Sequence, residues 1–153
     1  MDVNYINPFI TATIHVLKTV AATDASPGKP YLKKDNIARG DATGIIGLTG
    51  EARGTICVSF TEESILAIVS KMFSEEMTEM NEEIRDAVGE ISNMISGQAR
   101  QALEEMGKSL TAAIPTVIMG KKHSLSHMTN YPVIAIPFNT DKGGFTIEVC
   151  LEE

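Results

Sequence analysis

The sequence EMNEEIRDAVGEISNMISGQARQALEEM, residues 79–106, predicts one long amphipathic helix. Its apolar residues recur three or four positions apart and share one face: Ile84, Val88, Ile91, Ile95 and Ala102. Asp86, Glu90 and Asn93 fall within about 60° of one another at ~100° per residue, and the centre of the apolar face lies roughly 150° away. The core therefore takes one side of this helix, and two carboxylates with one amide share the other side.

Two glycines, Gly89 and Gly97, lie on the polar side of the same helix. A glycine in a helix interior costs roughly 0.5–1 kcal/mol relative to alanine, and asparagine is also a weak helix former. A face that is merely solvated would be expected to carry Glu, Lys, Ala or Gln. Small residues beside polar groups let another backbone approach closely, so these residues predict a docking face that carries chemistry. A solvated polar face is the alternative.

Length and composition predict a single domain over residues 1–153, long enough to bury a sizeable core. The net charge is −7 and the basic residues are scattered, which argues against nucleic acid as the main partner. No apolar run approaches the ~18–20 residues of a membrane span, and residues 1–4 do not resemble the start of a signal peptide. These features predict a cytoplasmic protein that does not enter a membrane.

The remaining elements are predicted from periodicity and turn residues. Apolar spacing predicts a first helix over residues 4–22, and Thr61 precedes a second at 62–73. Thr78 is the predicted N-cap of the long helix, and Gly107 ends it. The predicted strands are a hairpin at 44–48 and 54–60, a short strand at 116–120, and a second hairpin at 132–138 and 145–151.

The two hairpins resemble each other, and each lies downstream of a helix of the same general kind. This similarity indicates an internal duplication of a helix-plus-hairpin unit. Six or so antiparallel strands with long helices on one face give an α+β domain, built from two pseudo-repeated units.

The sequence predicts no nucleotide-binding site, metal site or reactive thiol. The chain has no P-loop and no GxGxxG motif after a strand. His123 and His127 are four residues apart, a spacing that would put them on one helix face, but no third ligand accompanies them. They are interpreted as solvated or structural, and no metal site is predicted. Cys57 and Cys150 lie inside predicted strands and are interpreted as buried thiols.

Asp86, Glu90 and Asn93, followed by the distal Pro115, resemble the signature of the CheC/CheX/FliY chemotaxis phosphatases. The resemblance covers almost the whole chain, including Asn7-Pro-Phe9 and the Gly-rich hairpin at 50–58. It is nearest to the CheX branch, because the first helix carries no second Glu-x-x-Asn. Pro115 lies 22 positions beyond Asn93, one residue short of the family spacing, and its role is left open.

The resemblance implies a phosphatase that accelerates hydrolysis of the aspartyl phosphate on a CheY-like response regulator. It implies that Glu90 pairs with a lysine of the regulator's active site and that Asn93 positions the attacking water. Asp86, Gly89 and Gly97 would contact the partner. Mg²⁺ is expected to come with the regulator, and no cofactor is expected on this chain.

Two other interpretations stay open. A non-catalytic module of the same fold would bind a receiver domain or another signalling partner without speeding dephosphorylation. In a structural homodimer, the face of the long helix would be the subunit interface. The resemblance also implies a homodimer for the phosphatase itself, and an exposed strand edge such as 145–151 is a candidate for its contact.

Overall fold

The computed structural model describes residues 3–121, 123, 127 and 131–152, and these form three α-helices and one eight-stranded sheet. The α-helices are α1 (Asn7–Ala21), α2 (Glu62–Phe73) and α3 (Glu82–Glu105), and a 3₁₀ turn at Val3–Tyr5 precedes α1. The strands are β1 (Ser26–Pro27), β2 (Tyr31–Lys33), β3 (Ala42–Gly50), β4 (Arg53–Phe60), β5 (Leu110–Ala112), β6 (Thr116–Met119), β7 (Val133–Thr140) and β8 (Gly143–Glu152).

Every strand pairing in the sheet is antiparallel, in the order β1-β7-β8-β4-β3-β5. Strand β2 also pairs with β7, and β6 also pairs with β3. The predicted α+β class is confirmed. The two predicted hairpins are β3–β4 and β7–β8, and they meet side by side through β4 and β8 at the centre of the sheet.

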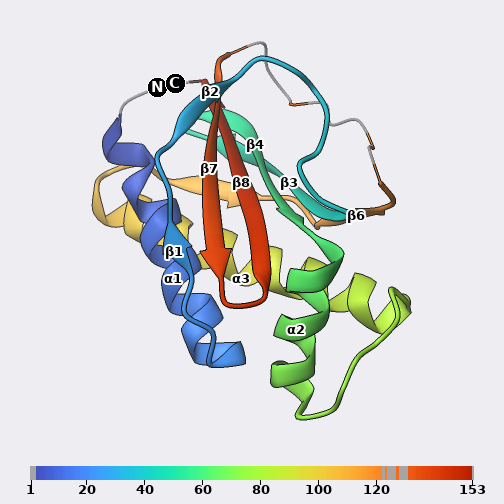
Figure 1. Cartoon of the computed structure of the whole chain (residues 1–153). Coiled ribbons are helices and arrows are strands. Elements are labelled where there is room, and N and C mark those ends of the chain that lie inside the picture. The colour runs from blue at the N-terminus through green and yellow to red at the C-terminus, as the bar shows by residue number, and fades with distance from the viewer. Residues whose placement is uncertain (1–2, 122, 124–126, 128–130, 153) are drawn as a thin grey trace.

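The chain runs twice through the same order of elements (Figure 1). One half is α1, the short strands β1 and β2, and the hairpin β3–β4; the other is α3, the short strands β5 and β6, and the hairpin β7–β8. Each half gives its short strands to the other half's hairpin, because β1 and β2 pair with β7 while β5 and β6 pair with β3. The predicted duplication therefore takes the form of two units that exchange their edge strands.

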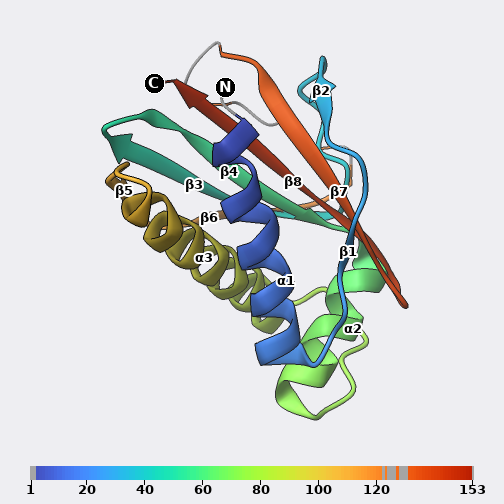
Figure 2. The same cartoon turned by 90° about the vertical axis from the view of Figure 1, so that its left-hand side faces the viewer.

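Helices α1 and α3 lie on one face of the sheet, and β2 runs along β7 at the edge of the sheet (Figure 2). The main core fills the space between the helices and the sheet, with side chains such as Phe9, Ile91, Ile56 and Val149 fully or almost fully buried. Burying this apolar surface stabilises the fold by roughly 25 cal/mol per Å². The core therefore fixes which side of each helix faces solvent.

The opposite face of the sheet is also covered, by polar as well as apolar contacts. Glu148 is 1% exposed there, and its carboxylate pairs with the Lys33 ammonium and lies 3.0 Å from His127 Nε2. Cys57 packs against Ala38 on this face, and neither Cys57 nor Cys150 is in a disulfide, as predicted. Burial raises the pKa of the Cys57 thiol, and the nearby Glu148 carboxylate adds to the rise.

Several predicted boundaries were wrong. Helix α3 begins after Asn81 rather than Thr78, because the Asn81 side chain accepts a hydrogen bond from Ile84 N at 3.1 Å. At its other end, Gly107 has φ +89°, as a residue that terminates a helix requires. Residues 145–151 are not an edge: they belong to β8, which pairs with β4 on one side and β7 on the other.

Candidate functional site

Helix α3 packs closely on strand β3, and this contact sets its rotation. Ser92 is fully buried and faces Gly44 of β3, where a Cβ would overlap the Ser92 hydroxyl. The hydroxyl itself donates to Val88 O at 2.7 Å. Because successive helical residues turn by ~100°, fixing Ser92 against the sheet directs Asn93 away from it.

The predicted triad lies on the solvent side of α3. Asp86, Glu90 and Asn93 are all exposed, while Ile84, Val88 and Ile91 are buried beneath them. Within the described ranges, none of the three polar side chains has an intramolecular hydrogen bond or ion pair. The structure thus brings the three predicted residues together on one face, where their carboxylate and amide groups are open to a partner.

The two glycines of α3 are not required by internal packing. A Cβ added at Gly97 would meet nothing nearer than Arg100 Nη2 at 3.9 Å, and one at Gly89 would make an ordinary contact with Val117 Cγ2 at 3.4 Å. Alanine would fit at both positions and would favour the helix. The glycines therefore lower helix stability, and no packing among the described residues compensates for that loss.

Strand β6 borders the site on one flank of α3. Arg85 Nη1 donates to Val117 O at 2.8 Å, and Gly89 lies against the Val117 side chain. Asn93 follows Gly89 by four residues, so it lies on the same flank, one turn farther along α3. The connection from β5 to β6 contains Ile114, which is 90% exposed and which the sequence analysis did not single out.

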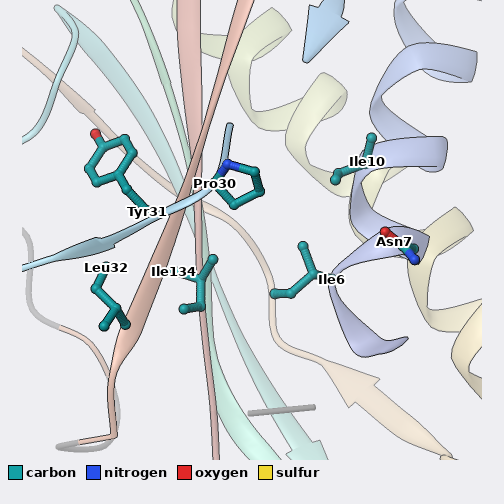
Figure 3. Close-up of a pocket in the computed structure, with 7 residues that line it drawn as sticks. All are labelled: Ile6, Asn7, Ile10, Pro30, Tyr31, Leu32 and Ile134. Atoms are coloured by element: carbon teal, nitrogen blue, oxygen red, sulfur yellow. The ribbon is translucent and has the colours of Figure 1, made fainter. Parts of the chain in front are cut away.

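An apolar hollow of the described structure lies elsewhere, between α1 and β2 (Figure 3). It measures about 280 Å³, and its lining is mostly apolar: Ile6, Asn7, Ile10, Pro30, Tyr31, Leu32 and Ile134. It carries no carboxylate and no titratable group other than the Tyr31 phenol. The α3 face is the candidate site, and it is an open surface rather than a cleft.

The histidines of the sequence analysis do not share a site. His123 Nε2 lies 2.7 Å from Thr43 Oγ1, whereas His127 pairs with Glu148, and neither residue is assigned to a helix. The helical spacing considered for them was therefore wrong, and the structural interpretation is confirmed. Among the described residues, no group of three or more His, Cys, Asp or Glu side chains is arranged to hold a metal ion. In the same part of the chain, no helix is both long and apolar enough to span a bilayer.

The family model for the chemotaxis phosphatase CheX matches residues 42–139, which include the whole α3 face and the flanking strand β6. The chain belongs to the CheX family. Among curated relatives, the CheY-P phosphatase CheX of Thermotoga maritima is 30% identical over 122 residues, 79% of each chain.

Solved CheX structures agree with the fold along nearly the whole chain. The crystal structure of CheX from Desulfovibrio desulfuricans is 49% identical, with a TM-score of 0.91 over 97% of this chain and 99% of that one. CheX in a CheX–CheY–BeF₃–Mg²⁺ complex from Borrelia burgdorferi is 27% identical, with a TM-score of 0.81 over 97% and 98%. The predicted family is therefore confirmed, and its CheX members share this arrangement of helices and sheet.

Proposed function

We propose that this chain hydrolyses the aspartyl phosphate of a CheY-like response regulator through the exposed face of α3. The observation that carries the proposal is the pairing of Glu90 and Asn93, both exposed and without intramolecular partners in the described chain, beside glycines that internal packing does not require. Membership of the CheX family supports the reaction class. The CheX–CheY complex supports the class of partner.

In this mechanism, Asn93 enters the regulator's active site and orients a water molecule in line with the phosphorus–oxygen bond. A side-chain amide suits this task because it offers both a hydrogen-bond donor and an acceptor. An acyl phosphate is already activated, and the regulator brings its own Mg²⁺. The phosphatase therefore needs to contribute positioning rather than a strong base.

Glu90 anchors the partner by pairing with a lysine of the regulator's active site, and Asp86 is an auxiliary contact one turn earlier on α3. Gly89 and Gly97 let the loops of the regulator approach the helix backbone. The acidic face also favours encounter with a basic group, since complementary charge raises association rates. We place this reaction in the cytoplasm, where response regulators act.

The test is release of inorganic phosphate from CheY-type receiver domains of the same genome, phosphorylated with acetyl phosphate and Mg²⁺. Substoichiometric wild-type chain should shorten the phosphoryl lifetime through many turnovers. The non-catalytic alternative predicts binding to the beryllofluoride-treated receiver with no change in that lifetime. That result would refute the catalytic assignment while keeping the partner.

The homodimer expected from the sequence is retained as a proposal, with a different contact. Because β8 is internal, the available edge beside α1 is β2, where Tyr31 and Leu32 are 39% and 58% exposed. Light scattering of the wild type and Leu32→Asp tests it. A wild-type mass of one chain, or a dimer unchanged by the substitution, would contradict this contact.

A further inference from the structure

We propose that Ile114 is the apolar contact that holds the phosphorylated receiver domain against α3, and that Pro115 serves to present it. This inference rests on the proposed function and adds a docking residue to it. Glu90 and Asn93 supply charge and an amide, but they bury little apolar surface. A protein interface of useful affinity needs at least one apolar or aromatic side chain at its centre.

Ile114 is the most exposed large apolar side chain of the described chain, at 90%. The next, Leu32, is 58% exposed and lines the hollow beside α1. The core of the described residues does not account for Ile114: Leu110 of β5 is buried in the core, and Val117 of β6 is partly buried against it. A side chain of this size gains free energy only when something covers it.

The strand register places Ile114 beside the catalytic face. Gly44 of β3 packs on Ser92, while Gly47, three residues on, accepts a hydrogen bond from Ala113 N at 2.9 Å. Three strand residues advance about 10 Å, which matches about seven residues of helix. Counted from Ser92, the connection after Ala113 is therefore level with about Ala99, less than two turns beyond Asn93 and on the flank of α3 that borders β6.

The backbone around Ile114 is fixed on both sides. Ala113 is bonded to β3, and Thr116 pairs with Ile45 of the same strand. Pro115 locks its own φ and restricts the preceding residue to extended conformations. The backbone thus holds Ile114 outward before any partner arrives, so less conformational entropy of this segment is lost on docking.

The other half of the molecule offers an internal comparison. There β1 and β2 lie on β7 as β5 and β6 lie on β3, and Gly28 N donates to Pro137 O as Ala113 N donates to Gly47 O. Pro30 directly precedes β2 as Pro115 directly precedes β6. The residue before that proline is Lys29, which is also exposed. The equivalent position therefore carries a charged residue, Lys29, in the half that contains α1, and an isoleucine, Ile114, in the half that contains α3.

The experiment measures steady-state phosphate release against receiver concentration for the wild type, Ile114→Ala and Ile114→Ser. Losing this contact should raise KM by about 5- to 30-fold and leave kcat unchanged, since docking and not water positioning is removed. The melting temperature should stay at the wild-type value, because the side chain makes no core contact. Ile37→Ala is the matched control, because Ile37 is 45% exposed beside Ala38 on the face opposite α3.

Each other outcome overturns the inference. An unchanged KM would show that Ile114 does not dock the receiver, and a fall in kcat at constant KM would assign it to the chemical step. An equal rise in KM for Ile37→Ala would mark a nonspecific effect. If the wild type itself fails to speed dephosphorylation, the proposed function fails first, and the two failures are thereby distinguished.

Discussion

The two halves of this molecule have the same order of elements and differ in the outward faces of their long helices. Helix α1 contains no acidic residue, and after Asn7 it has no asparagine. Its exposed positions include Thr11, Ile14, His15 and Lys18. Helix α3 exposes Asp86, Glu90 and Asn93 instead.

The difference separates what the scaffold supplies from what the side chains supply. In both halves a helix lies over the sheet and a proline-initiated short strand runs along a hairpin edge. Only α3 adds an acid–amide pair and unfilled glycines to that frame. The chain therefore offers one face of the kind proposed for catalysis, and the α1 half serves as an internal reference for it.

The largest expected effect comes from Asn93→Ala, which makes the α3 face as inert as that of α1. We expect roughly a 10²-fold or greater loss of accelerated dephosphorylation, since a positioned water is lost. Binding to the beryllofluoride-treated receiver should persist, because Glu90 and the rest of the face are intact. Measured phosphate release equal to wild type would contradict the role of Asn93.

Glu90→Ala removes the anchoring charge, and Glu90→Lys reverses it. We expect KM to rise roughly 10-fold for alanine and further for lysine, because a like charge would then face the regulator's lysine. Receiver titrations in the phosphate-release assay measure this rise. Glu105→Ala is the control, as it removes an exposed carboxylate at the far end of the same helix. A similar KM rise in the control would indicate a general charge effect.

Gly97→Ala should separate stability from activity. The added methyl enters open space in a helix, so the free energy of unfolding should rise by about 0.5–1 kcal/mol, while KM rises several-fold because the partner approaches less closely. Gly107→Ala is the control, and the changes expected for it in stability and in KM both differ from those for Gly97→Ala. Gly107 has φ +89°, so alanine there should lower stability by about 1 kcal/mol and leave KM alone. Urea unfolding and receiver titration measure the two quantities, and a Gly97→Ala variant with unchanged KM would assign this glycine no docking role.

The smallest effects are expected on α1. His15→Ala and Lys18→Ala should change phosphate release by less than about twofold, since the α1 face does not contact the receiver in this mechanism. Lys18 pairs with Asp24 at 3.0 Å, but both side chains are well exposed, and such a pair contributes less than about 1 kcal/mol to folding. A large rate loss in either variant would show that the two halves both take part in docking.

The long elements could be predicted from the sequence because their signals are local. The periodicity of α3 and the Gly-bounded hairpins are contained in windows of ten to thirty residues. The strands β1, β2 and β5 were missed because two or three residues carry no periodicity. Their existence depends on pairing with β3 and β7, residues far away in the chain.

The same division applies to the candidate site. Asp86, Glu90 and Asn93 lie on one helix, so their spacing alone brought them together. Ile114 could not be found this way, because a single isoleucine in a connection has no pattern. Its place along α3, less than two turns beyond Asn93, depends on the register of β5 and β6 on β3 and on the packing of Gly44 against Ser92. Asn81 as N-cap was missed because Thr78 offers the same chemistry three residues earlier.

The exchange of edge strands between the halves has a consequence for how this chain folds. Neither half can complete its own sheet, because the outer edge of β7 pairs with strands from residues 26–33 and the outer edge of β3 pairs with strands from residues 110–119. These pairings join residues that are about 60 to 110 positions apart, so the contact order is high and folding is expected to be slow relative to a helical domain of this size. A half expressed alone would leave long hairpin edges open to aggregation. Helix α3 packs on β3 and β5, so its packing depends on pairings that form only when both halves of the chain are in place.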